Sequence, residues 1–145
     1  MAADSKEANA QMVQRYFTEV LSSASLDKAW NSIDELMRPD FVFRISTIPR
    51  GVRGIQAYKE FLRGLKTAFP DGVFSIDKHM AETTRAAARW NFRGTHSGEF
   101  LGVPPTKKVI TDQGIDIFHF AGGKITDIWA NEDAFGLQKQ LGVFH

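Results

Sequence analysis

In the first half of the chain, apolar residues recur at three- and four-residue spacing, which is the spacing of one helix face. Ser5 can cap the first predicted helix. Pro39 ends the second, because a residue before proline is driven out of helical geometry. A strand is predicted between the second and third helices, followed by a loop that holds one Pro and two Gly. The helices cover residues 6–21, 27–37 and 55–69, the strand 41–48 and the loop 49–54.

In the second half, apolar and polar residues alternate instead, which is typical of strands. Helices followed by consecutive strands predict an α+β fold. Gly94 and Gly98 interrupt one long strand and predict a bend there, so that the sheet curls around a cavity with the helices closing its other side. The strands cover residues 73–80, 85–100, 107–120 and 124–131, and a short helix covers 133–141.

Alternation also assigns side chains of the last two strands to faces. One face carries both apolar and titratable groups from the two strands. If this face lines the cavity, His119 and Asp133 enter the same pocket. The set is Ile115, Ile117 and His119 on one strand and Trp129, Asn131 and Asp133 on the next.

Length and composition narrow the function classes. The 145 residues suit one domain, and a formal net charge of +1 favours neither nucleic acid nor an anionic membrane as partner. There is no Cys, which favours a cytoplasmic protein. The four His stand at no recognised ligand spacing, so neither a metal nor another cofactor is expected. The 12 Phe suit a hydrophobic cavity for an apolar or aromatic small molecule.

A set of motifs then points to a family. The pattern resembles the SnoaL-like polyketide cyclase family, of the nuclear-transport-factor-2-like superfold, over nearly the whole chain. The resemblance implies a single domain, residues 1–145, with a curved antiparallel sheet that forms a cone-shaped barrel and N-terminal helices that cover an internal cavity. The motifs are Trp90, Gly94-Thr95-His96, Gly98, Phe100-Leu101-Gly102, Pro104-Pro105-Thr106, Gly123-Lys124-Ile125, Trp129, Asp133 and Gln140-Leu141-Gly142.

The resemblance implies an activity as well. Characterised cyclases of the family close a ring by intramolecular aldol condensation on an aromatic polyketide ester, without a metal or a covalent intermediate. An aspartate near the start of the last helix is the acid/base and a histidine on the preceding strand assists; by position these are Asp133 and His119. The chain departs from the pattern at Lys107, where the family often has Gly, and at Phe43-Arg44, where it often has His.

Each candidate residue has a structural alternative. Asp133 can cap the helix that it precedes, and His119 can be a hydrogen-bonded core residue. His96 can donate to a substrate carbonyl or make a hydrogen bond across the bend. Trp90 and Trp129 can line the cavity or pack in the core. Ile117 and Asn131 complete the predicted substrate-binding set.

Three functions therefore stay open. The first is a cyclase-type enzyme with Asp133 as acid/base. The second is a non-catalytic ligand-binding or protein-interaction module on the same fold. The third is another reaction in a similar cone, such as epoxide hydrolysis or ketosteroid isomerisation, for which Asp116 and Arg89 are available without a clear motif. The polar residues that alternate with Arg89 predict a polar outer sheet face and a homodimer, or a larger oligomer, formed through it.

Overall fold

The computed structural model describes residues 5–143, which form four helices, one π-helical segment and a six-stranded sheet. Ser5 begins the first helix by accepting a hydrogen bond from the backbone N–H of Ala8. Ser25 caps the second in the same way through Lys28. The predicted first helix is therefore confirmed, but its last six residues are π-helical. The helical bounds are α1 Lys6–Arg15, η1 Tyr16–Leu21, α2 Leu26–Leu36, α3 Ile55–Ala68 and α4 Ala134–Leu141.

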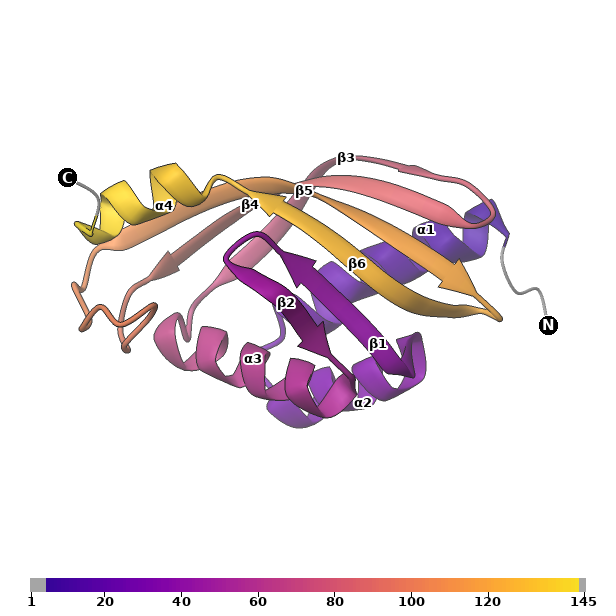
Figure 1. The fold of residues 1–145 in the computed structure, drawn as a ribbon, viewed down its shortest axis with the longest axis horizontal. Coiled ribbons are helices and arrows are strands. Elements are labelled where there is room, and N and C mark those ends of the chain that lie inside the picture. The colour runs from indigo at the N-terminus through magenta and orange to yellow at the C-terminus, as the bar shows by residue number, and fades with distance from the viewer. Residues whose placement is uncertain (1–4, 144–145) are drawn as a thin grey trace.

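The sheet has the order β2-β1-β6-β5-β4-β3. All neighbours pair antiparallel except β1 and β6, which run parallel, so the sheet is mixed and it does not close into a barrel. Helices α1 to α3 lie on one side of it and α4 lies at its far end (Figure 1). The strands are β1 Met37–Ile45, β2 Ile48–Arg53, β3 Val73–Ala81, β4 Arg85–Thr95, β5 Val109–Ala121 and β6 Lys124–Glu132.

The α+β fold is confirmed, with local differences from the expected elements. The strand expected over residues 41–48 is β1, which begins four residues earlier, at Met37, and ends at Ile45. The segment expected to be a loop contains β2, an edge strand that tolerates Pro49 because its free side needs no N–H donor. The predicted strand 85–100 ends at Thr95, and the chain then leaves the sheet. Gly98 is needed there for a close approach, because a Cβ atom would meet the backbone oxygen of Thr67 at the end of α3.

The two sheet faces differ sharply in burial. The face toward the helices carries the core, including Trp90, Phe118 and Ile128. The face away from the helices carries polar residues on β3 and β4, as expected, but apolar ones on β5 and β6: Ile115 and Trp129 are 48% and 52% exposed. No helix within residues 5–143 is long and apolar enough to span a membrane.

Candidate active site

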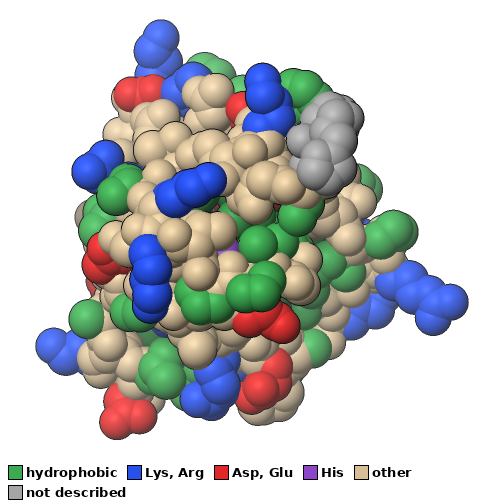
Figure 2. All heavy atoms as spheres, turned by 90° about the vertical axis from the view of Figure 1, so that its left-hand side faces the viewer, with side chains coloured by type: hydrophobic (Ala, Val, Ile, Leu, Met, Phe, Trp, Pro, Cys, Tyr) green, Lys and Arg blue, Asp and Glu red, His purple; other side chains and the backbone are tan. Residues whose placement is uncertain are grey.

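A cavity of about 140 Å³ lies between the helices and the sheet. Aromatic rings from both layers form its walls, among them Tyr58 and Phe61 from α3 and Trp90 from β4. Leu101 and Leu137 line it at the end of the molecule that carries α4, where hydrophobic side chains gather around a hollow (Figure 2). Among residues 5–143, its titratable groups are Tyr16, Tyr58, Asp112, Asp116 and Glu132, and no Lys, Arg or His lines it.

Asp116 is the most deeply buried carboxyl group of this cavity, with 3% of its surface exposed. Its Oδ1 accepts a hydrogen bond of 2.9 Å from the indole N–H of Trp90. Burial raises the pKa of Asp116 to about 7; the Trp90 hydrogen bond opposes this shift and the charge of Glu132 adds to it. The residue therefore titrates near neutral pH, as a general acid/base should.

Gly114 makes the contact between Trp90 and Asp116 possible. It faces Trp90 across the β4–β5 pairing, and the Trp90 ring crosses over it toward Asp116. A Cβ atom at this position would lie 2.5 Å from Cζ2 of Trp90 and would also meet the backbone oxygen of Asn131. The absence of a side chain at position 114 therefore sets where the indole lies.

A second carboxyl group, Asp112, lies two residues before Gly114 on the same face. Burial raises the pKa of Asp112 to about 9, with a further rise from a hydrogen bond to the Glu132 side chain and from the charge of Glu132. Two carboxyl groups in hydrogen-bond contact cannot both ionise freely. The contact with Glu132 therefore favours the protonated form of Asp112.

Two tyrosines complete the polar part of the cavity. The hydroxyls of Tyr16, at the start of η1, and Tyr58, in α3, are hydrogen-bonded to each other. Burial raises the pKa of each tyrosine well above its ordinary value, and the nearby charge of Asp116 raises both further. The pair is therefore neutral throughout the physiological pH range, and Asp116 is close enough to interact with it.

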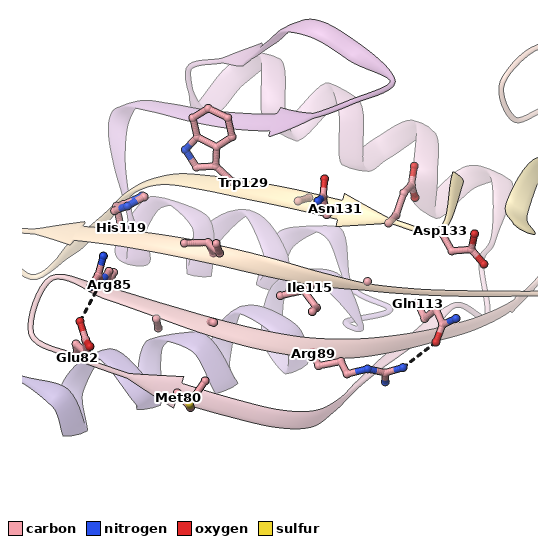
Figure 3. Close-up of a pocket in the computed structure, with 16 residues that line it drawn as sticks. Met80, Glu82, Arg85, Arg89, Gln113, Ile115, His119, Trp129, Asn131 and Asp133 are labelled. Atoms are coloured by element: carbon pink, nitrogen blue, oxygen red, sulfur yellow. Dashed lines mark hydrogen bonds and ion pairs between the residues drawn. The ribbon is translucent and has the colours of Figure 1, made fainter. Parts of the chain in front are cut away.

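The residues predicted as catalytic lie on the opposite face of the sheet. The expectation that this face is the one closed by the helices is wrong: it forms an open groove of about 1080 Å³ (Figure 3). His119, Ile117, Trp129, Asn131 and Asp133 all line the groove. The alternation of the two strands was predicted correctly, and the assignment of its two sides was reversed.

His119 and Asp133 lie at opposite ends of this groove (Figure 3). His119 is paired with Asp127 on β6, and its Nδ1 lies 3.2 Å from an Asp127 carboxylate oxygen. Asp133 follows six residues later, which corresponds to about 20 Å along a strand. The exposed Asp133 carboxylate accepts a hydrogen bond of 3.0 Å from the N–H of Gly136 and so caps α4. The structure thus separates these two residues, and their catalytic roles stay a prediction.

The two other predicted residues divide between the cavity and the core. Trp90 lines the cavity, as predicted. His96 is fully buried, and its Nδ1 accepts a 3.1 Å hydrogen bond from the N–H of Thr106. This bond joins the two arms of the segment between β4 and β5, which agrees with the structural alternative for His96.

Sequence reasoning missed Tyr16, Tyr58, Asp112 and Glu132 as candidate site residues, and it named Asp116 only for the alternative of another reaction in a similar cone. A signal was present on β5, because Asp112 and Asp116 share their strand face with Phe118 and Phe120, the most apolar face of that strand. A carboxyl group in register with such a face is a candidate for a raised pKa. Among residues 5–143, no group of three or more His, Asp or Glu side chains is arranged to hold a metal ion.

Comparisons with known proteins agree on one family. The sequence profile of the SnoaL-like polyketide cyclase family matches residues 10–141. A candidate SnoaL-like polyketide cyclase from Jannaschia sp. CCS1 is 21% identical with a TM-score of 0.88, covering 100% of this chain and 99% of its own. IdmH from Streptomyces antibioticus, a candidate polyketide cyclase, is 25% identical with a TM-score of 0.74, covering 92% of this chain and 98% of its own.

TsrD from Streptomyces laurentii is 24% identical with a TM-score of 0.81, covering 96% of this chain and 98% of its own. No curated protein matches the sequence. The profile match spans almost the full length of the chain, and the solved structures share its fold from end to end. The chain therefore belongs to the SnoaL-like polyketide cyclase family.

Proposed function

We propose that this protein is a cofactor-free enzyme that closes a ring by an intramolecular aldol reaction, with Asp116 as the acid/base. The observation that carries the proposal is a single buried carboxyl group, aimed into an aromatic cavity and held by the Trp90 indole. Family membership supports the reaction class, and the position of Asp116 in the helix-covered cavity supports its choice as acid/base in preference to Asp133.

The environment of Asp116 suits this chemistry. An aldol closure needs a base that removes a proton from carbon beside a carbonyl group and an acid that protonates the new alkoxide. A carboxyl group whose pKa lies near 7 can perform both steps at neutral pH. No hydrogen bond to Oδ2 of Asp116 is present among residues 5–143, so that oxygen is free for the substrate proton.

The cavity also constrains the substrate. A protein cavity of about 150 Å³ holds one benzene ring, so the 140 Å³ present here suits a compact ligand that forms or carries one ring. The walls are aromatic and aliphatic, and the charged side chains that the described part of the chain places there are all acidic. We therefore expect a neutral diketone or keto ester rather than a free carboxylic acid or a phosphorylated compound, because an anion would meet carboxyl groups and no cation.

The test is turnover of compact diketones and keto esters, followed by mass spectrometry of the dehydrated or cyclised product. Asp116→Asn keeps the acceptor for the Trp90 N–H but removes the titratable group. We expect it to lower the rate by about 10²–10⁴-fold. Asp127→Asn, a carboxyl group on the outer face, is the matched control and should leave the rate within about threefold. Normal turnover by Asp116→Asn would reject the proposal.

A second candidate keeps the chemistry on the outer face, with Asp133 and His119 as catalytic residues. The observation that favours it is the groove that both residues line, which is larger than the internal cavity. If Asp133→Asn abolishes turnover while Asp116→Asn retains it, this candidate replaces the first. If compact ligands bind to the cavity without being converted, the non-catalytic ligand-binding module is the correct description.

We also propose that the protein is a homodimer formed through the outer sheet face. The support is the apolar surface on this face, where Ile115, Ile117 and Trp129 on β5 and β6, and Met80 on the edge strand β3, are all exposed. Replacing Ile117 with Lys places a charge in that surface without touching the core. The expected result, in analytical ultracentrifugation, is a dimer for the wild type and a monomer for Ile117→Lys. A monomeric wild type at high concentration would contradict the proposal.

A further inference from the structure

The hydrogen-bonded tyrosine pair lies in the cavity without a role in the proton transfer just described. Tyr16 and Tyr58 are the only tyrosines of the chain, and they are 1% and 0% exposed. They come from different elements, η1 and α3, and they meet only through their hydroxyl groups across the cavity wall. Tyrosine at these positions therefore places two polar atoms where phenylalanine would fill the same apolar space.

The pair has one hydroxyl proton more than it uses. Two hydroxyls carry two protons, and the bond between them consumes one. Within residues 5–143 the hydroxyls of Tyr16 and Tyr58 have no other hydrogen-bond partner. A buried donor without an acceptor costs free energy. The remaining proton is therefore available for an acceptor on a ligand that occupies the cavity.

The surrounding rings fix where this donor lies. Tyr16 packs edge-on against Phe17 and Phe118, with ring centroids 5.3 and 5.5 Å apart. Tyr58 packs against Phe41 and Phe43 at 5.1 and 5.3 Å. Tyr16 is also the first residue of the π-helical segment η1. Such segments are rare in proteins, and those that occur often lie at functional sites. The donor is thus preorganised and does not move to meet its ligand.

We propose that the Tyr16–Tyr58 pair binds the substrate carbonyl oxygen that becomes the enolate oxygen during the reaction at Asp116. This inference rests on the proposed function and adds the orientation of the substrate. The carbonyl oxygen points to the tyrosine hydroxyls, the carbon that loses its proton lies beside Asp116, and the rest of the molecule extends toward Leu101 and Leu137.

The steps balance without a co-reactant. Asp116 takes the proton from the carbon beside the carbonyl; the C–H electron pair forms the C=C bond of the enolate, and the C=O π electrons move onto the oxygen held by the tyrosine hydroxyl. The enolate carbon then forms the new C–C bond with a second carbonyl of the same molecule, whose oxygen becomes an alkoxide. Asp116 returns its proton to that alkoxide.

Charge placement favours this arrangement. Before proton transfer, one negative charge lies on Asp116, close enough to both tyrosines to raise their pKa values. After the transfer, Asp116 is neutral and the charge lies on the enolate oxygen at the hydroxyl pair. The cavity holds the same net charge in both states, and the donor acts on the atom where charge develops.

The experiment uses two probes of equal shape, 4-nitrophenolate as an enolate-like anion and 4-nitrotoluene as its neutral counterpart. Binding is measured in the Asp116→Asn background, which reproduces the neutral state of Asp116, at a pH where the free phenol is ionised. We expect Asp116→Asn to bind nitrophenolate more tightly than the wild type. Adding Tyr16→Phe and Tyr58→Phe together should weaken nitrophenolate binding by about 10–100-fold, because a hydrogen bond to a charged group is lost.

The double tyrosine replacement removes both hydroxyls, so neither is left buried alone and the fold is retained. Nitrotoluene affinity should change by less than about threefold in the same variants. Equal weakening of both probes would mean that the tyrosines only shape the cavity and would overturn the inference. Unchanged nitrophenolate affinity, or no binding of either probe, would overturn it too. These results are separate from turnover by Asp116→Asn, which alone decides the proposed function.

Discussion

The two faces of β5 put residues that are neighbours in sequence into opposite environments. Asp116 is 3% exposed beneath the helices, whereas Ile115 and Ile117, on either side of it, are 48% and 43% exposed on the outer face. The apolar residues of this strand segment thus point outward and the carboxyl group points inward. This inversion of the usual pattern leaves a carboxyl group in the cavity and an apolar surface in the groove.

The comparison predicts opposite results for carboxyl groups on the two faces, and this is the largest effect expected. Asp116→Asn should lower turnover by about 10²–10⁴-fold, since the acid/base is lost. Asp133→Asn should leave turnover within about threefold, because its carboxylate lies on the exposed face and caps α4. Parallel kinetics of the two variants measure this contrast directly. A reversed ranking would show that the outer groove is the active site.

Stability should depend on pH through the buried carboxyl groups. The pKa of Asp116 is raised to about 7 in the folded protein, so the folded state holds a proton that the unfolded state releases near pH 4. The contribution of Asp116 to the free energy of unfolding is therefore highest below about pH 4. It falls as pH rises to about 7 and is constant above that.

The measurement is denaturant unfolding of the wild type and Asp116→Asn at several pH values. The wild type should lose up to about 4 kcal/mol relative to the variant between about pH 4 and pH 7.5. Asp112, whose pKa is raised to about 9, continues the decline at higher pH in both proteins and so cancels in the difference. If the difference in unfolding free energy between the two proteins stayed constant across the pH range, the pKa of Asp116 would not be raised by burial in the folded state.

The position of Trp90 over Gly114 supplies the third test. Gly114→Ala should destabilise the protein by roughly 1–3 kcal/mol, because the new methyl group meets both the Trp90 ring and the backbone of β6. Gly64→Ala, in α3 where no atom lies within 4 Å of the new Cβ, is the matched control and should stabilise by about 0.5–1 kcal/mol. Urea midpoints of the two variants measure the difference. Equal effects would mean that the indole lies elsewhere.

Much of the fold followed from the sequence for physical reasons. Helical spacing predicted α2 and α3 within one residue, and it predicted the combined span of α1 and η1 without the change to π-helix, because their buried stripes are long and regular. Alternation predicted β3, β5 and β6. Family resemblance added the layer arrangement, which periodicity alone does not determine. β2 was missed because Pro49 and Gly51 in a short edge strand look like a loop.

The site was harder to predict because alternation defines two faces without saying which one is inside. Trp129 and Ile117 suggested that their face was buried, and apolar character is normally a sound guide. In this chain the outer face of β5 and β6 is apolar and the inner face carries carboxyl groups, so apolar character did not identify the face that the helices cover. Tyr16 and Tyr58 lie at helical spacing among apolar residues, and nothing in that spacing indicates that their two hydroxyls meet.

The smallest effect concerns Asp133 itself, and it separates a capping residue from a catalytic one. Its carboxylate accepts the N–H of Gly136 at 3.0 Å at the start of α4. Asp133→Ala removes this bond and should cost about 1 kcal/mol, whereas Asp133→Asn keeps an acceptor and should cost only a few tenths. Thermal melts of both variants measure the two losses of stability, and we expect both variants to keep the turnover of the wild type.

If Asp133→Asn lost activity while it melted like the wild type, the carboxylate would be needed for chemistry and the role predicted from its place in the sequence would stand. If both variants kept full activity and only the alanine variant melted at a lower temperature, Asp133 would serve only to cap α4. The proton transfer would then be performed by the carboxyl groups on the inner face.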